Sequence, residues 1–449
     1  MSPAWGRSRP WNAAAASGSP RSSSSTAPLS SRIPKRLFTL AERAHRASRV
    51  YATALTYFAH WADAPDAPAI DSAYHAYLDA ALASEDRAAF TRASMRFLAT
   101  LRNGHTIFID FGLAKQAGTL PFTARSVAGQ WVVTASRVPG MRPGEVVETI
   151  DGRPFEEFFR ELTPLLSAST EVWKRRLLFM QVPGVAPFAH LLPERFVLGL
   201  AGGRQVSVDR RSMLDVELGE TEGSWLEPGK LAYIRVPSFF FVPDAPSQEK
   251  RAVQLVREYK DAAALIVDVR GNGGGSTPGD LHKALMNRPY RFWTESTPAN
   301  LPFFRVRASK GSWEYQLFER SELLWRSSTS EPAAEAYQGR LAVLADGGCF
   351  SACEDFVMPF KYNGRAIVVG ETTGGSTGQP YVVELGDGMQ AIVGSKREMF
   401  PDGGRFEGVG IRPDVEVSPT VEDLRAERDV VLEGARARLL AAVEGSGGR

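Results

Sequence analysis

The chain has 449 residues, of which 43% are hydrophobic and 23% charged, and its formal net charge is +2. This is the composition of an ordinary globular protein with room for two or three domains. No basic run suggests a nucleic-acid partner, and no stretch approaches the roughly 18–20 consecutive apolar residues of a membrane span.

Residues 1–33 are rich in Ser, Arg, Pro and Ala and contain no Asp or Glu. They lack the apolar core of a secretory signal and resemble an organelle transit peptide or a solvated tail. We expect a disordered leader. The missing secretory core favours the cytoplasm, while an exported, periplasmic location stays open.

Residues 34–108 are expected to form a helical N-terminal domain. Apolar residues recur at three- and four-residue spacing from Leu37 to Trp61, and two further helical patterns cover Asp71–Leu82 and Glu85–Leu101. A Pro-rich break at Ala64–Pro68 separates the first two patterns.

Residues 109–167 change to a period of two, which indicates strands. Trp131–Thr134 and Glu145–Ile150 are predicted strands, and Phe155–Leu162 is a predicted helix after the turn Asp151-Gly152. This order resembles the middle of a PDZ domain, a fold that binds peptide ends by strand addition. Residues 168–225 are expected to connect this PDZ-like segment to the next domain.

Residues 226–420 are expected to form an α/β core, because predicted strands alternate with predicted helices. The alternation favours a mostly parallel sheet covered by helices. A C-terminal helix over Val421–Val443, within residues 421–449, completes the chain. The predicted core elements are strands at Leu231–Val236, Ala264–Val269, Leu341–Ala345 and Ala366–Val369, helices at Ser247–Lys260 and Asp280–Met286 and from Ser351, and a hairpin at Tyr381–Gly394.

A glycine-rich turn, Asp268-Val269-Arg270-Gly271-Asn272-Gly273-Gly274-Gly275, follows the most apolar predicted strand. Exposed backbone N–H groups in such a turn bind a phosphate or stabilise an oxyanion, or the turn is purely structural. Dinucleotide binding fits poorly, because Pro278 interrupts the helix that should follow directly.

A second strand runs into Asp346-Gly347-Gly348-Cys349-Phe350-Ser351-Ala352-Cys353-Glu354. Ser351 then opens a helix, where the amides favour developing negative charge; a simple helix cap is the alternative. The two cysteines lie too close in sequence to staple the fold, and no zinc or redox motif is present. We expect two small buried side chains.

Two further segments, Gly370-Glu371-Thr372-Thr373-Gly374-Gly375-Ser376-Thr377-Gly378 and Gly408-Val409-Gly410-Ile411-Arg412-Pro413-Asp414, complete the pattern DxRxNxGG, SAxE, GExTxG and GxGIxPD. This combination resembles the tail-specific (carboxyl-terminal processing) proteases and tricorn-core peptidases. It implies a multidomain α/β protein with a ββα-type, ClpP/crotonase-like protease core. The family also includes retinoid-binding modules.

The resemblance implies roles for individual residues. Ser351 would be the nucleophile, and the amides of Ala352 and of Gly274 or Gly273 would form the oxyanion hole. Gly275, Thr373 and Ser376 would contribute to binding.

The general base departs from the processing-protease pattern. Ser376 stands where that branch carries a lysine. Lys361 and Lys396 are candidate substitutes for this base, but both are expected to be solvated surface side chains. The tricorn-like branch uses a histidine instead, and the segment Arg102-Asn103-Gly104-His105-Thr106 resembles its histidine segment. An imidazole with an ordinary pKa near 6.5 can accept the serine proton.

His105 is therefore the expected base, with Glu407 as the distant carboxylate that orients the site. Gly104 stands where that branch has a serine, so we expect this hydroxyl relay to be broken or replaced by water. Glu354 is expected to be a helix-start charge or a salt-bridge partner, and the other five histidines are expected to be structural. Asp268 and Arg270 are expected to hold the oxyanion loop by pairing.

The sequence predicts a serine-type endopeptidase that cleaves protein tails or unstructured peptides without a metal or cofactor. Its partner is a peptide or unfolded protein, with no nucleic acid and no integral membrane segment, and an oligomer is possible. The alternative is a non-catalytic family member that binds a peptide or an apolar ligand. Esterase chemistry on small acyl substrates also stays open.

Overall fold

The computed structural model describes residues 38–61, 70–181, 185–210, 219–241, 246–298, 322–327 and 329–445. The predicted leader 1–33 and the predicted break Ala64–Pro68 lie outside the described residues. Among the described helices, none is long and apolar enough to span a bilayer.

The N-terminal helices begin at side-chain caps. Thr39 and Glu42 form a capping box at the start of the first helix, and Asp86 accepts a hydrogen bond from Ala89 N at the start of the third. These helices are α1 (Leu40–Tyr57), α2 (Ile70–Leu82) and α3 (Arg87–Ala99), and a short α4 (Phe111–Ala117) follows. The predicted helical patterns therefore form three helices.

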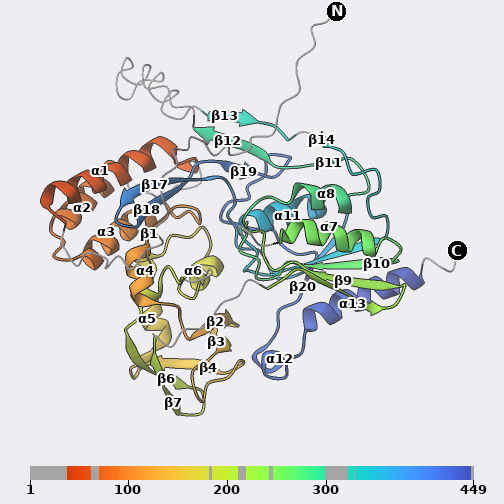
Figure 1. Ribbon diagram of the computed structural model, residues 1–449, viewed down its shortest axis with the longest axis horizontal. Coiled ribbons are helices and arrows are strands. Elements are labelled where there is room, and N and C mark those ends of the chain that lie inside the picture. The colour runs from red at the N-terminus through yellow and green to blue at the C-terminus, as the bar shows by residue number, and fades with distance from the viewer. Residues whose placement is uncertain are drawn as a thin grey trace, which may run out of the picture. The chain divides into compact units, whose positions relative to one another are not determined.

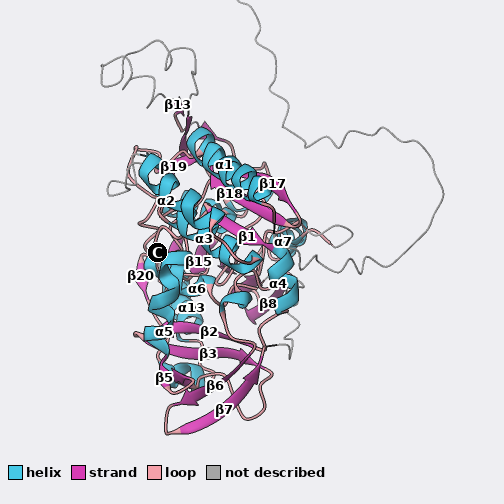
Figure 2. Cartoon of the chain, turned by 90° about the vertical axis from the view of Figure 1, so that its left-hand side faces the viewer, coloured by secondary structure: helices cyan, strands magenta, loops and turns pink. Residues whose placement is uncertain are grey.

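A six-stranded antiparallel sheet follows, in which strands run side by side in the order β2-β3-β4-β6-β7, with β5 paired to β4 (Figure 2). Its strands are β2 (Phe122–Val127), β3 (Gln130–Ser136), β4 (Val146–Ile150), β5 (Arg153–Pro154), β6 (Arg195–Leu200) and β7 (Arg204–Asp209). Helices α5 (Phe155–Leu162) and α6 (Glu171–Leu177) lie between β5 and β6 in sequence, with the 3-10 turns Thr163–Leu165 and Ala189–Leu191.

The sheet does not stop at the predicted boundary of the PDZ-like segment. Strands β6 and β7, assigned from sequence to the connecting region 168–225, pair directly with β4 and with each other. Pairing between strands that are distant in sequence leaves no local pattern in the sequence. The boundary predicted at residue 167 therefore cuts through the sheet instead of marking its end.

The core is a six-stranded sheet with the order β20-β16-β15-β10-β9-β8. All its pairings are parallel except the one between β8 and β9. The strands are β8 (Glu222–Glu227), β9 (Leu231–Arg235), β10 (Ala264–Asp268), β15 (Arg340–Ala345), β16 (Ile367–Gly370) and β20 (Val415–Glu416). The prediction of a mostly parallel, helix-covered sheet is confirmed.

Helices cover both faces of this sheet, because successive side chains of a strand point to opposite faces. On β10, Leu265 and Val267 pack in the cluster that includes helices α7 (Gln248–Glu258), α8 (Gly279–Leu285) and α11 (Ala352–Tyr362). Ala264 and Ile266 pack in the other cluster, against α13 (Val430–Glu444). Figure 1 shows α13 on the opposite side of the sheet from the other three.

Small sheets join the N-terminal helices to the core. Strand β1 (Ile107–Asp110) pairs antiparallel with β18 (Met389–Gly394), which pairs with β17 (Pro380–Gly386). This pairing brings the loop before β1 to the core. The remaining strands are β11 (Tyr290–Arg291) with β14 (Thr329–Ser330), and β12 (Thr294–Pro298) between β13 (Glu322–Trp325) and β19 (Arg397–Met399).

Two local predictions are wrong. The single helix expected at Val421–Val443 is divided into α12 (Val421–Arg425) and α13, and Asp429 caps the start of α13. Cys349 and Cys353 are joined by a disulfide across a sequence separation of four. The bridge connects the turn before α11 to its first turn, on either side of Ser351.

Candidate active site

Ser351 lies at the sharp turn between β15 and α11. Its backbone has φ 57° and ψ −126°, a left-handed conformation that is unusual for a residue with a side chain. A strained strand-to-helix turn of this kind projects a serine hydroxyl at the start of a helix, as in a nucleophile elbow.

His105 lies in the loop between α3 and β1, and its ring reaches Ser351. His105 Nε2 is 2.9 Å from Ser351 Oγ, across 246 positions of sequence. The loop is fixed by Asn103, whose Oδ1 accepts hydrogen bonds from His105 N (3.0 Å) and Thr106 Oγ1 (2.8 Å). The structure thus brings together the two residues on which the predicted chemistry depends.

The other ring nitrogen of His105 contacts Ser376. The distance from His105 Nδ1 to Ser376 Oγ is 3.0 Å. A neutral imidazole with its proton on Nδ1 can donate to Ser376 and accept from Ser351 through Nε2. Ser376 therefore contacts the histidine directly, whereas its sequence position had suggested a binding residue.

Gly104 lies against Ser376 and leaves no room for a side chain of its own. A Cβ atom at Gly104 would lie 2.8 Å from Ser376 Cβ and 2.9 Å from the Phe350 ring. The space that a serine at 104 would need is occupied by Ser376, whose hydroxyl contacts the imidazole. The hydroxyl that contacts the imidazole therefore comes from Ser376, 271 positions after His105 in the sequence.

An aromatic stack holds the imidazole in place. The His105 ring lies 4.7 Å from the Phe350 ring at an interplanar angle of 12°, and Phe350 stacks on Trp173 at 3.7 Å. His105 is 8% exposed, and burial lowers its pKa to about 4. At neutral pH the ring is uncharged and can accept a proton.

Glu407 holds the histidine loop. Its Oε1 accepts hydrogen bonds from Asn103 Nδ2 (2.7 Å) and from Ser169 Oγ, and Ser169 Oγ in turn accepts one from Gly104 N (2.8 Å). Glu407 is buried, at 4% exposure. The contacts connect this carboxylate to both residues that precede His105.

The glycine-rich loop passes close to Ser351. A Cβ at Gly274 would lie 2.7 Å from Ser351 Cβ and 2.6 Å from Phe350 O, so only glycine fits there. The N–H of Gly274 is donated to Asn272 Oδ1 (2.9 Å), which disagrees with its predicted role as the free oxyanion donor. Gly273, Gly275 and Ala352 line the adjoining cavity.

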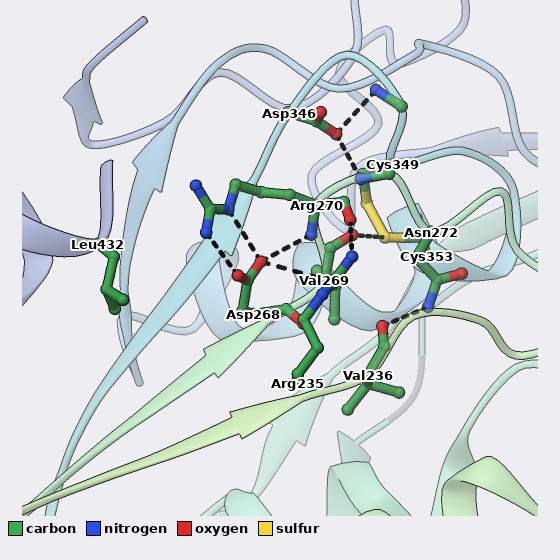
Figure 3. A network of polar contacts seen from close by, with 12 residues as sticks. Arg235, Val236, Asp268, Val269, Arg270, Asn272, Asp346, Cys349, Cys353 and Leu432 are labelled. Carbon is green, nitrogen blue, oxygen red and sulfur yellow. Dashed lines mark hydrogen bonds and ion pairs between the residues drawn. A yellow bond between two sulfur atoms is a disulfide. The ribbon is translucent and has the colours of Figure 1, made fainter. Parts of the chain in front are cut away.

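Asn272 ties this loop to its surroundings. Its Nδ2 donates to Val236 O (3.1 Å), and its backbone O accepts from Phe350 N (3.1 Å). Figure 3 shows Asn272 beside the disulfide of Cys349 and Cys353. The side chain thus fixes the loop relative to the turn that carries Ser351.

Asp268 and Arg270 pair as predicted, and Figure 3 shows both beside the loop. Arg270 Nη2 lies 2.6 Å from Asp268 Oδ2 and 2.7 Å from Asp429 Oδ2, so the guanidinium bridges β10 and the start of α13. Asp346 Oδ1 accepts hydrogen bonds from Gly271 N (2.7 Å) and Gly348 N (2.9 Å). These contacts fix the N-terminal end of the glycine loop and join it to the turn at Gly348.

Glu354 lies in the first turn of α11, the expected helix-start position, and it is also a buried anchor. It is fully buried, and its carboxyl group accepts from Gly375 N (2.7 Å), Ser376 N (3.0 Å) and Ser351 N (3.3 Å), and from Thr373 Oγ1. Burial raises its pKa to about 8, against the effect of these donors. Glu354 therefore couples Ser351 to the loop that carries Ser376.

Thr373, expected among the binding residues, is 1% exposed. Its Oγ1 donates to Glu354 and accepts from Ile411 N (2.8 Å). It holds two loops together beneath the site, which corrects the predicted contact with a ligand.

The side chains of the two candidate lysines are 30% and 29% exposed, and both are ion-paired. Lys361 pairs with Asp414, and Lys396 Nζ lies 2.7 Å from Glu295 and 3.1 Å from Glu398. Burial alone would lower the pKa of Lys396, but the two carboxylates raise it above its ordinary value. An ammonium held this way is a poor proton acceptor.

His60 is buried near the site. Its Nδ1 is 3.9 Å from Glu407 Oε2, and its Nε2 contacts Lys396 O at 3.1 Å. Burial lowers its pKa to about 3, and the nearby His105 adds to the shift. His60 thus joins the surroundings of Glu407, where its sequence position gave no motif.

A cavity of about 1160 Å³ opens over Ser351 and His105. In the described ranges, no three His, Cys, Asp or Glu side chains are grouped so that they could hold a metal ion. The arrangement can transfer a proton from Ser351 Oγ to His105 Nε2 while Ser376 holds the opposite ring nitrogen.

Sequence reasoning missed four residues of the site: Phe350, Trp173, Ser169 and Asn103. Asn103 and Phe350 stand next to motif residues, and a search for side chains flanking Gly104 and Ser351 could have found them. Ser169 and Trp173 carry no signal of their own, because only the fold brings α6 to the histidine loop.

Comparison with known proteins is consistent with this geometry. Residues 230–417 match the family model for Peptidase family S41. A carboxyl-terminal-processing peptidase 2 from chloroplasts of Arabidopsis thaliana is 30% identical over 197 residues, covering 44% of this chain and 34% of that protein. A chloroplastic C-terminal processing peptidase of Tetradesmus obliquus is 26% identical over 200 residues, covering 44% and 38%. The match thus spans little more than a third of either relative.

The fold is similar over a greater length to a solved structure, mature CPAF. The TM-score is 0.69 at 16% sequence identity, with 91% of this chain and 99% of that chain covered. A structure of mature CPAF complexed with lactacystin gives a TM-score of 0.67 at 15% identity, covering 90% and 98%. At this identity the likeness concerns the fold. The matched segment, residues 230–417, carries the glycine loop, Ser351 and Glu407 and is similar to peptidase family S41.

Proposed function

We propose that the protein is a serine peptidase in which Ser351 attacks the peptide carbonyl carbon and His105 takes the hydroxyl proton. The observation that carries the proposal is the 2.9 Å contact between Ser351 Oγ and His105 Nε2. This distance lies within the range of a working nucleophile and base. The imidazolium then returns its proton to the leaving amine, and a water molecule repeats the sequence on the acyl-enzyme.

The tetrahedral oxyanion is held by backbone amides. Ala352 opens α11, so its N–H has no partner within the helix and lies at the positive end of the helix dipole. Since the amide of Gly274 is donated to Asn272, Gly273 or Gly275 supplies the second donor. Such donors act on charge that develops only in the transition state.

Ser376 and Glu407 act as positioning residues. Ser376 Oγ accepts the Nδ1 proton of His105, which fixes the tautomer that leaves Nε2 free to act as base. Glu407 acts through Asn103 and Ser169, which hold the backbone on the N-terminal side of His105.

The substrate is a peptide or an unstructured protein tail. The two curated relatives are named for C-terminal processing, and a cavity of about 1160 Å³ accommodates several residues of an extended chain. The sheet β2–β7, predicted to be PDZ-like, lends residues Thr123, Ala124 and Arg125 of β2 to the cavity wall. We propose that this sheet contacts the substrate beyond the scissile bond.

The test uses a fluorophosphonate probe and a library of quenched fluorescent peptides. Wild-type protein should be labelled at Ser351 and should hydrolyse a subset of peptides; Ser351→Ala should do neither. Ser224→Ala, at an exposed position on β8, is the matched control and should behave as wild type. Hydrolysis retained by purified Ser351→Ala would end the proposal, as would an unlabelled, inactive wild type with intact folding.

A further inference from the structure

Beside Ser351 and His105, the cavity contains a second group of ionisable side chains that the peptidase mechanism does not use. Asp355, Lys396 and Glu398 line the same cavity, and Glu295 lies behind Lys396. The four residues come from α11, β12, β19 and the turn before β19.

This group lies next to the catalytic side chains. Asp355 is four residues after Ser351 on α11, so both lie on one face of the helix start. Asp355 also accepts a hydrogen bond from Thr377 Oγ1 (2.9 Å), the neighbour of Ser376. A Cβ at Gly378 would lie only 2.8 Å from Glu398 Oε2, which places Glu398 against the same loop.

The carboxyl groups differ in how well they are satisfied. Asp355 accepts hydrogen bonds from Thr277 Oγ1 (2.6 Å) and Trp293 Nε1 (2.9 Å) as well as Thr377. Glu398 Oε1 lies 3.1 Å from Lys396 Nζ, but Glu398 Oε2 is buried and has no hydrogen-bond partner. The whole residue is 2% exposed. A buried, unsatisfied carboxyl oxygen is costly unless a ligand pairs with it.

The charges are also unbalanced. Within the described residues, the ammonium group of Lys396 pairs with Glu295 and Glu398 and also acts on the carboxyl group of Asp355. Burial raises the pKa of Asp355 and, further, that of Glu398 above their ordinary values. A second cation in the cavity would favour the ionised forms of both carboxyl groups.

We propose that Glu398, with Asp355 and Glu295, forms a specificity subsite for a positively charged side chain of the peptide, lysine or arginine. The way in which an ammonium already sits between Glu295 and Glu398 shows that this chemistry fits the site. A metal ion is a weaker occupant, since these carboxylates are not grouped as a metal site within the described residues. The inference rests on the proposed peptidase function and deepens it.

The first experiment compares peptides that differ at one position. At each position flanking the scissile bond, lysine is compared with norleucine, which has a similar stem without the charge, and with glutamate. In wild type, kcat/KM for lysine at one position should exceed that for norleucine by about tenfold to a hundredfold, the range for a hydrogen bond to a charged group. Glutamate at that position should be the poorest substrate.

The second experiment changes the carboxyl group. Glu398→Gln keeps the shape and removes the charge, and should reduce the lysine-to-norleucine ratio to near one, mainly through KM. Glu433→Gln, on the exposed side of α13, is the matched control and should keep the wild-type ratio. Equal rates for lysine and norleucine peptides at every position of the wild type would overturn the subsite without any variant. An unchanged ratio in folded Glu398→Gln would overturn it too.

Binding separates the subsite from the peptidase proposal. Affinity of Ser351→Ala for the lysine and norleucine peptides is measured by fluorescence anisotropy, with and without Glu398→Gln. If wild type hydrolyses nothing yet Ser351→Ala binds the lysine peptide in a Glu398-dependent way, the subsite stands and the peptidase proposal falls. If peptides are cleaved with no preference for a cation, the reverse holds.

Discussion

Replacing Ser376 by alanine tests whether a neutral hydroxyl can do the work that a carboxylate does in other serine peptidases. The substitution removes one atom group, the Oγ that lies 3.0 Å from His105 Nδ1, in a side chain that is fully buried. In the transition state the imidazole carries a positive charge, so the lost hydrogen bond is charge-assisted. Such bonds contribute about 1.5–3 kcal/mol, which predicts a loss in kcat/KM of about 10-fold to about 150-fold.

The loss should appear in kcat with KM nearly unchanged, because the hydroxyl contacts the base and not the substrate. The assay is steady-state hydrolysis of a fluorogenic peptide, measured from pH 4 to 9. A merely structural role would lower stability and leave the pH profile alone, whereas loss of the Nδ1 partner should also shift the acid limb of kcat/KM. Ser224→Ala serves as control. A folded Ser376→Ala with activity within threefold of wild type and an unshifted profile would refute the reasoning.

Three other outcomes are expected. Because burial lowers the pKa of His105 to about 4, the base stays neutral through pH 5, and kcat/KM should fall only as the pH approaches 4; an acid limb near 6.5 would contradict this. Gly274→Ala should lose about 100-fold in kcat/KM, because its Cβ would lie 2.6 Å from a backbone oxygen. The control is Gly271→Ala, where φ is also positive but nothing lies close to the added Cβ, so this variant should lose stability and keep its activity. Equal activities of the two variants would contradict the close fit of Gly274 against Ser351. Reducing the Cys349–Cys353 bridge should lower the free energy of unfolding by about 2 kcal/mol in urea titrations; an unchanged midpoint with both thiols titrated would exclude that effect.

Most of the core could be predicted from sequence because its signals are local. Residues 264–267 form an uninterrupted apolar run, and such runs are typical of strands buried on both faces. The glycine loop after it and the short helix-start motif around Ser351 are equally local. Their order along the chain was enough to predict the sheet and the nucleophile's position in it.

The failures have a common physical cause, which is that they depend on pairing across long sequence separations. Strands β6 and β7 join a sheet begun more than 40 residues earlier, and nothing within 195–209 indicates the partner. The hydroxyl beside the imidazole comes from Ser376 and not from position 104, because the two loops pack so closely that only one of these side chains fits. No pattern within either segment reveals it.

The acid–base partners illustrate the same division. His105 was indicated by the resemblance of residues 102–106 to the histidine segment of the tricorn-like branch, and a serine rather than a lysine stands at position 376. The aromatic rings that hold it could not be found in this way, since Trp173 and Phe350 look like ordinary core residues in sequence. Glu407 was placed near the site by its motif, but its contacts with Asn103 and Ser169 emerge only from the fold.

The stack of Trp173, Phe350 and His105 has a consequence for any shortened form of the chain. The nucleophile belongs to the segment 230–417, while the ring that activates it, and the indole that steadies that ring, come from outside. An isolated core would contain the Ser351 hydroxyl without the histidine that accepts its proton. Under the proposed mechanism, proton transfer from Ser351 requires that the two halves of the chain have docked, so a partly folded molecule would have no peptidase activity.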